Sequence, residues 1–372
     1  MFGRHFWAMT RKEIIHIWRN PGTLILILLM PTLLLLILAY SLTADITHVP
    51  VAVFDQDGSQ MSRAFIDQIT AGNDLNLNHW VNSDQEIEDL FQSNQIKAVI
   101  ILAPDFSKKL SSVDGLPLQI IIDGTEPQSG WFALDHIVNR AEKFAAQRLS
   151  NVLGDSSLNP IDVRIHTLYN PDLKSSVSLI PGLLSMVVGL PGLSIALSLA
   201  REREHGTLEQ LMTTPLRRAE LLLGKISPYI LGGLVNVLLT TFVVRYWFKV
   251  PFNGNFFLFF VLSTIFLFAI LSMGILIGVF IKTQPGALAL SFLLIFFPGF
   301  FLTGIFFPIT SMPEEMQLEA MFLPGTHYAT VTRGAFLTGV GLDVLWLPAV
   351  AMLGMGIIFT VIGAIFFEKK LA

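Results

Sequence analysis

The chain has 372 residues, of which 52% are hydrophobic, 14% are charged and 30 are phenylalanine. A soluble fold of this size cannot bury so much apolar surface, so the composition is typical of a membrane protein. The formal net charge of −4 does not indicate nucleic acid as a partner. The absence of cysteine excludes disulfides, thiolate metal sites and a cysteine nucleophile.

Residues 1–21 predict a helix that lies in the plane of the membrane interface. Its apolar side chains fall largely on one side: Phe6, Met9, Ile14, Ile17 and Trp18. Basic side chains fall mostly on the others, among lipid phosphates. The candidate functional residues of this helix are Arg11, Lys12, Glu13, Trp18 and Arg19. A positively charged flank with aromatic anchors explains the pattern equally well, so a further role in binding a partner stays open.

Six segments are apolar and long enough to cross a bilayer core about 30 Å thick, which takes roughly 20 helical residues. They run over residues 23–42, 177–199, 226–244, 256–281, 285–307 and 344–367. None contains Asp, Glu, Lys, Arg or His, which disfavours a proton-driven transporter. We interpret the first as a retained anchor, because its apolar stretch is longer than that of a typical signal peptide and no convincing cleavage site follows it.

Lys and Arg beside the spans gather mainly on the side that carries both termini and residues 200–225. This asymmetry predicts cytoplasmic termini, since cytoplasmic loops of membrane proteins are enriched in basic residues. Residues 43–176 are then expected outside the cytoplasm, and the remaining membrane part is divided into residues 22–42 and 177–372.

Residues 43–176 predict a small α/β domain with a mainly parallel or mixed sheet, because short β runs alternate with amphipathic helices. The expected strands cover residues 49–55, 96–102, 116–123 and 161–169, and the expected helices cover 62–69, 84–95 and 130–153. Asp55, Asp57 and Asp123 lie where two strands end, which is compatible with a ligand site. Ordinary Asp-Gly turn chemistry is the interpretation we favour. The domain is expected to bind or gate, without catalysis.

Residues 201–225 form a dense block of charged, capping and turn residues between the second and third spans. The second helix is expected to continue until Gly206 breaks it, and Thr207 is expected to cap a new helix together with Gln210. That helix ends after about two turns at Pro215. A helix this short needs a surface to pack on, which either the N-terminal helix or a separate soluble subunit could supply.

A transport pathway lined by these apolar spans favours lipophilic or amphiphilic cargo. Candidate pathway positions are polar or aromatic residues within the spans: Asn236, Ser263, Thr264, Phe300 and Thr303. Hydroxyl side chains also bond back to their own helix, and the many Phe residues also pack between helices or face lipid.

Several stretches in the same order resemble permease subunits of ATP-binding cassette (ABC) transporters, specifically the type-2 exporter family with a large extracytoplasmic domain. They include "KEIIHIWRNPGTL", "VAVFDQDGSQMSRAFI", "EREHGTLEQLMTTPLRRAELLLGK" and "LPGTHYATVTRGAFLTG". The resemblance covers essentially the whole chain. It implies an α-helical polytopic membrane protein with six transmembrane helices and an α/β extracytoplasmic domain inserted between helices 1 and 2.

The resemblance also implies how the chain is driven. Residues 200–225 would couple to a separate ATPase through Glu202, Glu204, Gly206, Thr207, Leu208, Glu209, Leu211, Met212 and Pro215. The N-terminal helix would be the family's connecting element and touch the same ATPase. Residues 308–340 would form short re-entrant helices at the outer face. Two permease chains, either identical or sister chains, would alternate between inward-facing and outward-facing states.

The chain has no phosphate-binding loop, because Gly224-Lys225-Ile226 lacks the preceding Gly and the following Ser or Thr of that motif. No cofactor is therefore expected on this chain, and ATP with Mg is expected on the partner. A periplasmic adaptor and membrane lipid are further candidate partners, and the bacterial inner membrane is the expected location. The alternative function is a membrane-anchored receptor or scaffold whose outer domain binds a ligand or an envelope partner.

Overall fold

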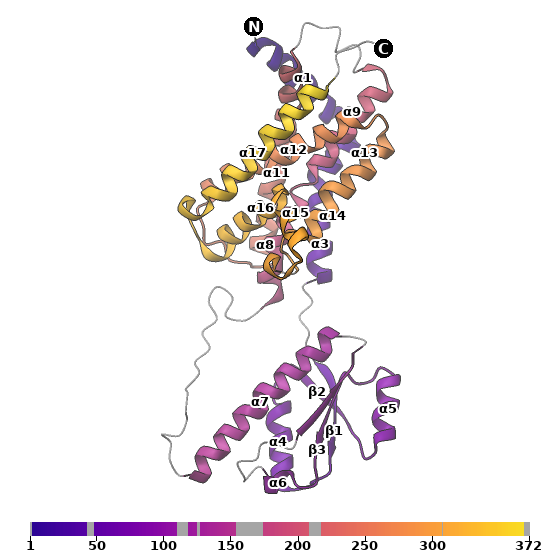
Figure 1. The fold of residues 1–372 in the computed structure, drawn as a ribbon, viewed down its shortest axis with the longest axis vertical. Helices are drawn as coiled ribbons and strands as arrows, with labels where there is room; N and C mark the ends of the chain where they lie inside the picture. Colours follow the sequence, from indigo (N-terminus) through magenta and orange to yellow (C-terminus); the bar gives the residue numbers. More distant parts are fainter. Residues whose placement is uncertain are drawn as a thin grey trace. The chain divides into compact units, whose positions relative to one another are not determined.

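A computed structural model describes residues 2–42, 48–109, 118–124, 127–153, 174–207, 217–306 and 308–367 (Figure 1). The chain divides into two compact units. The larger unit comprises Met1–Ala44 with Thr167–Ala372, and the smaller comprises Asp45–His166.

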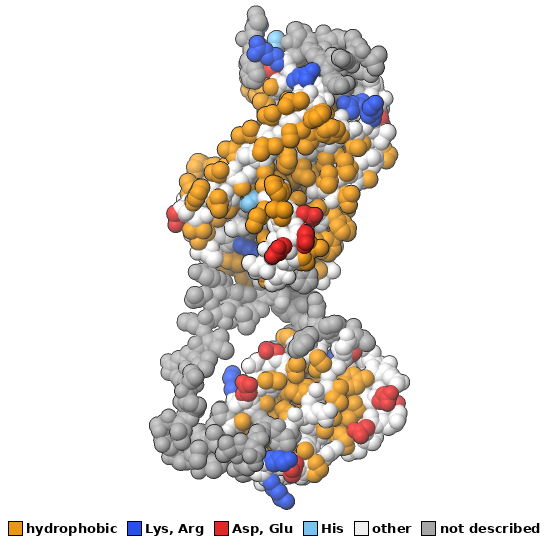
Figure 2. Space-filling model, in the orientation of Figure 1, with side chains coloured by type: hydrophobic (Ala, Val, Ile, Leu, Met, Phe, Trp, Pro, Cys, Tyr) orange, Lys and Arg blue, Asp and Glu red, His pale blue; other side chains and the backbone are white. Residues whose placement is uncertain are grey.

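The larger unit contains six helical segments long and apolar enough to cross a membrane, one for each predicted span. They are Pro21–Leu42, Ser175–Glu204, Arg218–Trp247, Phe256–Phe280, Gln284–Phe301 and Leu342–Phe366. Hydrophobic side chains cover the middle of the visible face of this unit, and basic side chains gather at the end that carries the N-terminal helix (Figure 2). The chain is thus a multi-pass membrane protein.

Several spans are built from more than one helical piece. The first consists of α2 (Pro21–Leu24), the π-helical turn η1 (Ile25–Leu29) and α3 (Met30–Leu42), and it follows α1 (Phe2–Arg19). The second consists of α8 (Ser175–Val187) and α9 (Pro191–Glu204), and the third of α11 (Arg218–Phe242) and η3 (Val243–Trp247). The fourth is α12 (Phe256–Phe280) and the sixth is α17 (Leu342–Phe366). The fifth consists of α13 (Gln284–Ser291), η4 (Phe292–Phe296) and α14 (Phe297–Phe301).

The helix of the third span begins at Arg218, ahead of the apolar segment predicted from residue 226, and its Glu220 and Lys225 are buried among neighbouring helices. One predicted boundary was wrong. The fifth span ends at Phe301, not at residue 307. Apolar composition alone does not mark the end of a helix, since a chain can leave the helical conformation while it stays buried.

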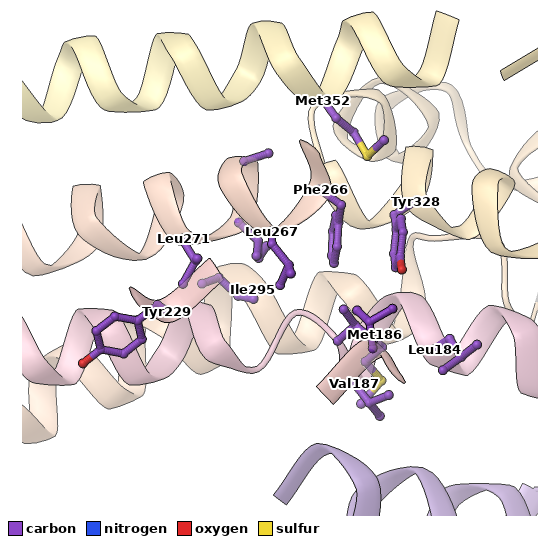
Figure 3. Packing of buried hydrophobic residues seen from close by; sticks show 14 of the residues in the cluster. Leu184, Met186, Val187, Tyr229, Phe266, Leu267, Leu271, Ile295, Tyr328 and Met352 are labelled. Atoms are coloured by element: carbon purple, nitrogen blue, oxygen red, sulfur yellow. The ribbon is translucent and has the colours of Figure 1, made fainter. Parts of the chain in front are cut away.

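The fourth span packs closely on α9 and α17. A Cβ at Gly274 would lie 2.1 Å from the carbonyl oxygen of Gly192, so α12 and α9 touch backbone to backbone. Buried side chains of neighbouring elements pack on those of α12 (Figure 3). They come from α8, α11, η4, α16 and α17.

The segment between the fifth and sixth spans consists of short helices. They are η5 (Ile309–Ser311), α15 (Glu314–Met321), α16 (Pro324–Arg333) and the π-helical turn η6 (Gly334–Thr338). Pro308, Pro313 and Pro324 each stand at the start of one of these pieces, as the sequence predicts.

Helix α16 enters the bundle and does not remain on its surface. The Tyr328 ring stacks on Phe266 with 4.1 Å between ring centroids, and its hydroxyl lies 2.7 Å from the Ser263 hydroxyl (Figure 3). Phe266 lies about 15 Å along α12 from its first residue, at 1.5 Å of rise per residue. This depth fits the re-entrant arrangement that the resemblance implies.

The smaller unit is a four-stranded sheet between helices. Its strands are β1 (Val49–Asp55), β2 (Leu75–Trp80), β3 (Ala98–Leu102) and β4 (Leu118–Ile122), in the order β2-β1-β3-β4. Strand β1 is parallel to β2 and β3, and β4 is antiparallel to β3, so the sheet is mixed.

Helices cover both faces of this sheet. Helices α4 (Gln60–Thr70) and α7 (Pro127–Leu153) pack on one face through Phe65, Ile137 and Phe144. Helix α5 (Asp84–Gln92) packs on the other through Ile87, and α6 (Phe106–Lys109) follows β3. Strand β2 is not among the strands expected from the sequence, and the strand expected over residues 161–169 lies outside the described residues.

The acidic strand ends have structural roles. Asp55 Oδ1 accepts hydrogen bonds from the backbone N–H groups of Asp57 and Gly58, and Gly58 is left-handed with φ 60°. Asp55 Oδ2 accepts from the Ser62 hydroxyl at 2.7 Å, and Asp123 pairs with Lys97. The favoured interpretation, turn chemistry, is therefore confirmed for Asp55.

Candidate functional site

Helix α1 packs along the first turns of the third span. A Cβ at Gly224 would lie only 2.9 Å from Met9 Cβ, so the absence of a side chain at Gly224 allows this close approach. Thr10 Oγ1 lies 3.0 Å from Ser227 Oγ, and Met9 and Thr10 are buried. The N-terminal helix is thus docked on α11 by steric fit as well as by hydrogen bonding.

Four charged side chains from three helices meet beside this contact: Lys12 and Glu13 of α1, Glu202 of α9, and Lys225 of α11. Lys225 Nζ donates to Glu13 Oε1 at 3.1 Å and to Glu202 Oε2 at 2.8 Å. Lys12 Nζ also donates to both carboxylates, at 3.0 Å to Glu13 Oε1. Each ammonium therefore bridges the same two carboxylates. We call these four residues the charged cluster.

The charged cluster is buried. Lys225 and Glu13 have no exposed surface, Glu202 is 5% exposed, and only Lys12 reaches the surface. Burial acts to raise the pKa of the Glu13 carboxyl, but the positive charge of Lys225, a hydrogen bond from His16 and the positive charge of Lys12 together outweigh it and hold this pKa well below its usual range. Glu13 is therefore ionised, and the two carboxylates balance the two ammonium groups.

A buried charge without its partner costs about 3–5 kcal/mol, so each member of the charged cluster depends on the others. Glu202 and Lys225 stand on either side of the segment 207–217, and Glu13 lies on the N-terminal helix. The helix before this segment is bonded to Lys12 of α1, and the helix after it is bonded to the neighbouring Glu13, so both flanking helices are joined to the same turn of α1.

Further contacts hold the ends of the flanking helices. Glu220 Oε2 accepts from the Arg217 backbone N–H at 2.8 Å and lies 3.4 Å from His5 Nδ1 of α1. On the other side, Glu204 accepts from the backbone N–H of Gln284 at 2.8 Å and from its side-chain amide. Glu202 and Glu204 therefore have different partners: one joins α9 to α1 and α11, and the other joins it to α13.

The helix break predicted at Gly206 is present. Helix α9 ends at Glu204, and Gly206 has a φ of 69°, a left-handed conformation that favours glycine. Thr207 is already helical, so its prediction as the cap that precedes the helix was wrong by one position. Its hydroxyl donates to the Glu202 carbonyl at 3.1 Å. The coupling candidates Leu208, Glu209, Leu211, Met212 and Pro215 lie outside the described residues.

The apolar residues predicted to lie on one side of α1 have different surroundings. Met9 is buried against α11, whereas Ile14 and Trp18 are exposed, Trp18 at 77%, as contact with lipid requires. The buried face includes the charged Glu13, because Lys225 and Glu202 offer partners that only the folded chain brings near. Arg11 and Arg19 are exposed together with Trp18, so this side of α1 is free to contact lipid or another protein.

Oxygen and nitrogen atoms of Glu13, His16 and Glu202 lie close enough together to hold a metal ion. Both carboxylates already accept from two ammonium groups, however, and Lys225 is fully buried against them. A divalent cation would face two positive charges at this point, so the residues do not fit a metal.

The pathway candidates are not brought together. Asn236 donates from α11 to the Leu28 carbonyl of the first span at 3.1 Å, whereas Ser263 bonds to Tyr328. Thr264 donates to a carbonyl of its own helix, and Thr303 donates to the Gly299 carbonyl of the preceding α14. Phe300 packs against Phe306. Each of these residues thus makes local contacts within its own helix or with a neighbouring one, and their role in a pathway stays a prediction.

Comparison with known proteins agrees with this architecture. The sequence matches the family described as ABC-2 family transporter protein over residues 21–365. The probable multidrug ABC transporter permease YbhS of Escherichia coli K12 is 28% identical over 362 residues, which cover 95% of each chain. The probable multidrug ABC transporter permease YbhR of the same organism is 25% identical over 347 residues, 93% of each chain.

A third relative, the inner membrane transport permease YhhJ of E. coli K12, is 24% identical over 382 residues, 99% of this chain and 98% of its own. These relatives do not favour the receptor or scaffold alternative. The chain therefore belongs to the ABC-2 family of transporter proteins, as a permease subunit of an ABC exporter.

Proposed function

We propose that the charged cluster transmits the movement of a separate ATPase subunit to the membrane spans. The observation that carries this proposal is the pair of bonds from Lys225 to Glu13 and Glu202, which joins α1 to both helices that flank residues 207–217. A force applied to this segment or to α1 would move the second and third spans together, because buried ion pairs are directional and costly to break.

The partner in this proposal is an ATPase that binds ATP and Mg and docks on residues 200–225. The exposed side of α1, with Trp7, Arg11 and Trp18, extends the docking surface. Aromatic and Arg side chains are enriched at protein interfaces, which supports this assignment. The chain itself would hydrolyse no ATP, since it carries no phosphate-binding loop.

In the same proposal the chain lies in the bacterial inner membrane with both termini in the cytoplasm. The basic side chains at the end that carries α1 support this orientation (Figure 2). The α/β unit then lies outside the cytoplasm, where it could meet a periplasmic adaptor.

The cargo in this proposal is lipophilic or amphiphilic, and two permease chains form the pathway. An apolar groove of about 360 Å³ between the first, second and fifth spans supports both points, and Leu34, Leu193 and Phe292 are among its lining residues. It is almost devoid of polar atoms, so it suits a second permease or an apolar solute. Relatives named multidrug permeases, and a linearmycin resistance permease of Bacillus subtilis, are consistent with such cargo.

The test is Lys225→Met in the permease reconstituted with its ATPase. We expect transport and permease-dependent ATP turnover to be lost, because Glu13 and Glu202 would share only the half-exposed Lys12. The matched control is Lys282→Met, which changes an exposed lysine in the loop between α12 and α13.

A triple variant separates coupling from folding. Glu13→Leu, Glu202→Leu and Lys225→Met together remove the buried charges, and such replacements are often neutral or stabilising. We expect normal thermal stability with transport still low. Full transport by the triple variant would show that packing alone couples the helices and would overturn the proposal.

A further inference from the structure

We propose that an anionic phospholipid binds in a groove at the far end of the third span, opposite the charged cluster. The groove has a volume of about 600 Å³ and lies between the end of α11 with η3 and the segment that begins α12. Its lining combines apolar side chains with one guanidinium and one buried hydroxyl. The inference does not rest on the proposed coupling mechanism.

Arg245 supplies a positive charge that is free to bind. Its side chain is exposed and has no carboxylate partner among the described residues, and its guanidinium carbon lies 5.9 Å from the centroid of the Tyr246 ring. Guanidinium groups bind phosphate with two parallel hydrogen bonds, so an unpaired Arg at this position suits a phosphate.

Thr241 supplies a hydroxyl that lacks a partner. The residue is 6% exposed, it lines the groove, and its Oγ1 makes no hydrogen bond to any described residue. Its neighbour Thr240, by contrast, donates to the Asn236 carbonyl at 2.8 Å. An unsatisfied buried hydroxyl costs about 1–3 kcal/mol, and a rotation of the Thr241 side chain toward the groove would let the hydroxyl donate to a ligand oxygen and relieve this cost.

The groove is apolar toward the middle of the third span and positively charged near the end of that span. Leu238, Thr241 and Arg245 lie at spacings of three and four residues, which places them on one face of the helix. Leu238 is farthest from the helix end, and Arg245 lies beside Tyr246 and Trp247. Aromatic residues of this kind occupy the level of the lipid head groups.

This order of side chains matches a phospholipid. The phosphate would bind Arg245, a glycerol or ester oxygen would accept from Thr241, and an acyl chain would pack on Leu238, Phe242, Phe252 and Phe256. The positive charge favours a lipid with a net negative head group over a zwitterionic one. A free phosphate would use Arg245 but leave the apolar wall uncovered.

The test is native mass spectrometry of the full chain released from nanodiscs of equal parts phosphatidylglycerol and phosphatidylcholine. We expect the wild type to retain phosphatidylglycerol preferentially. Arg245→Gln should weaken retention about tenfold or more, as expected when a charge-assisted hydrogen bond is lost. Thr241→Val, which keeps the shape but removes the hydroxyl, should weaken it by a smaller factor.

The matched control is Lys249→Gln, because Lys249 is exposed at the same end of the span but does not line the groove. It should retain lipid as the wild type does. Equal loss in Arg245→Gln and Lys249→Gln would mean that only the general surface charge attracts lipid, and the proposal would fail. Equal retention of both lipids by the wild type, or retention unchanged in Thr241→Val, would also overturn it.

Discussion

The two ends of the membrane unit hold their helices together by different means. At the end that carries α1, four charged side chains from three helices are paired with one another. At the other end, α16 is held by the stacking of Tyr328 on Phe266 and by Arg333, which donates to the Gly304 carbonyl at 2.7 Å. The first end thus uses ion pairs, and the second uses aromatic packing and backbone carbonyls.

This difference indicates that the end held by ion pairs is the one suited to transmit helix movement in a defined direction. Ion pairs between buried side chains define the position of each helix closely, and their loss is costly. Stacked rings prefer certain offset geometries, but each atomic contact between them is weak, so they tolerate small displacements more easily. We therefore expect substitutions at the α1 end to disturb coupling most, and substitutions around α16 to act mainly on local stability.

The largest effect is expected from Gly224→Leu. The new side chain would collide with Met9, because a Cβ at Gly224 would lie only 2.9 Å from Met9 Cβ, so α1 would be pushed off α11. We expect the free energy of unfolding of the purified chain to fall by about 1–3 kcal/mol, the usual cost of overpacking. Coupled transport should be lost. Thermal unfolding and transport assays in proteoliposomes measure the two effects.

The control for Gly224→Leu is Gly354→Leu on α17, where a Cβ would meet no atom within 4 Å. This variant should keep wild-type stability and transport. Normal transport by Gly224→Leu would contradict the view that the contact between α1 and α11 is needed for coupling.

A smaller effect is expected from Tyr328→Phe at the opposite end. The substitution keeps the stacking on Phe266 but removes the hydroxyl that lies 2.7 Å from Ser263. Ser263 still donates to the Phe259 carbonyl, so the free energy of unfolding should fall by only about 1 kcal/mol, and coupling should be retained. A loss of coupling comparable to that of Gly224→Leu would remove the contrast between the two ends.

The smallest effect is expected from a cross-link between Thr10→Cys and Ser227→Cys. The two hydroxyl oxygens are 3.0 Å apart, and the chain has no other cysteine, so oxidation should form one defined disulfide. If α1 and α11 move as one body, the oxidised protein should transport as well as the reduced one. Inhibition that is reversed by reductant would show that these helices separate during the cycle.

Much of the architecture follows from local sequence properties. Apolar length predicted each of the six spans, because a helix that crosses a bilayer needs a fixed number of apolar residues. Glycine and proline predicted the break at Gly206 and the short helices after Pro308. Glycine permits a left-handed backbone and proline cannot continue a helix, and both effects are confined to neighbouring residues. Strand β2 was not recognised, since "LNLNHW" alternates leucine with polar residues and has only one apolar face.

The candidate site shows where such reasoning stops. Glu202 was selected for its place in the charged block, but nothing in the sequence pairs it with Glu13 and Lys225, which lie 189 and 23 positions away along the chain. A signal did exist: Glu13 falls among the apolar residues of α1, and a carboxylate on an apolar face indicates a buried partner. Hydrophobic periodicity predicted lipid contact for the apolar side of α1, which the exposure of Trp18 is compatible with, but it did not show that Met9 is buried against α11.

By itself, the sequence determined the membrane spans, the helix breaks and strands β1, β3 and β4 of the α/β unit, because each depends on the composition of one continuous segment. Only the tertiary structure decided which face of α1 is buried, and which charges are paired. These depend on side chains from distant segments, since a buried charge is stable only where the fold brings an opposite charge within hydrogen-bonding distance.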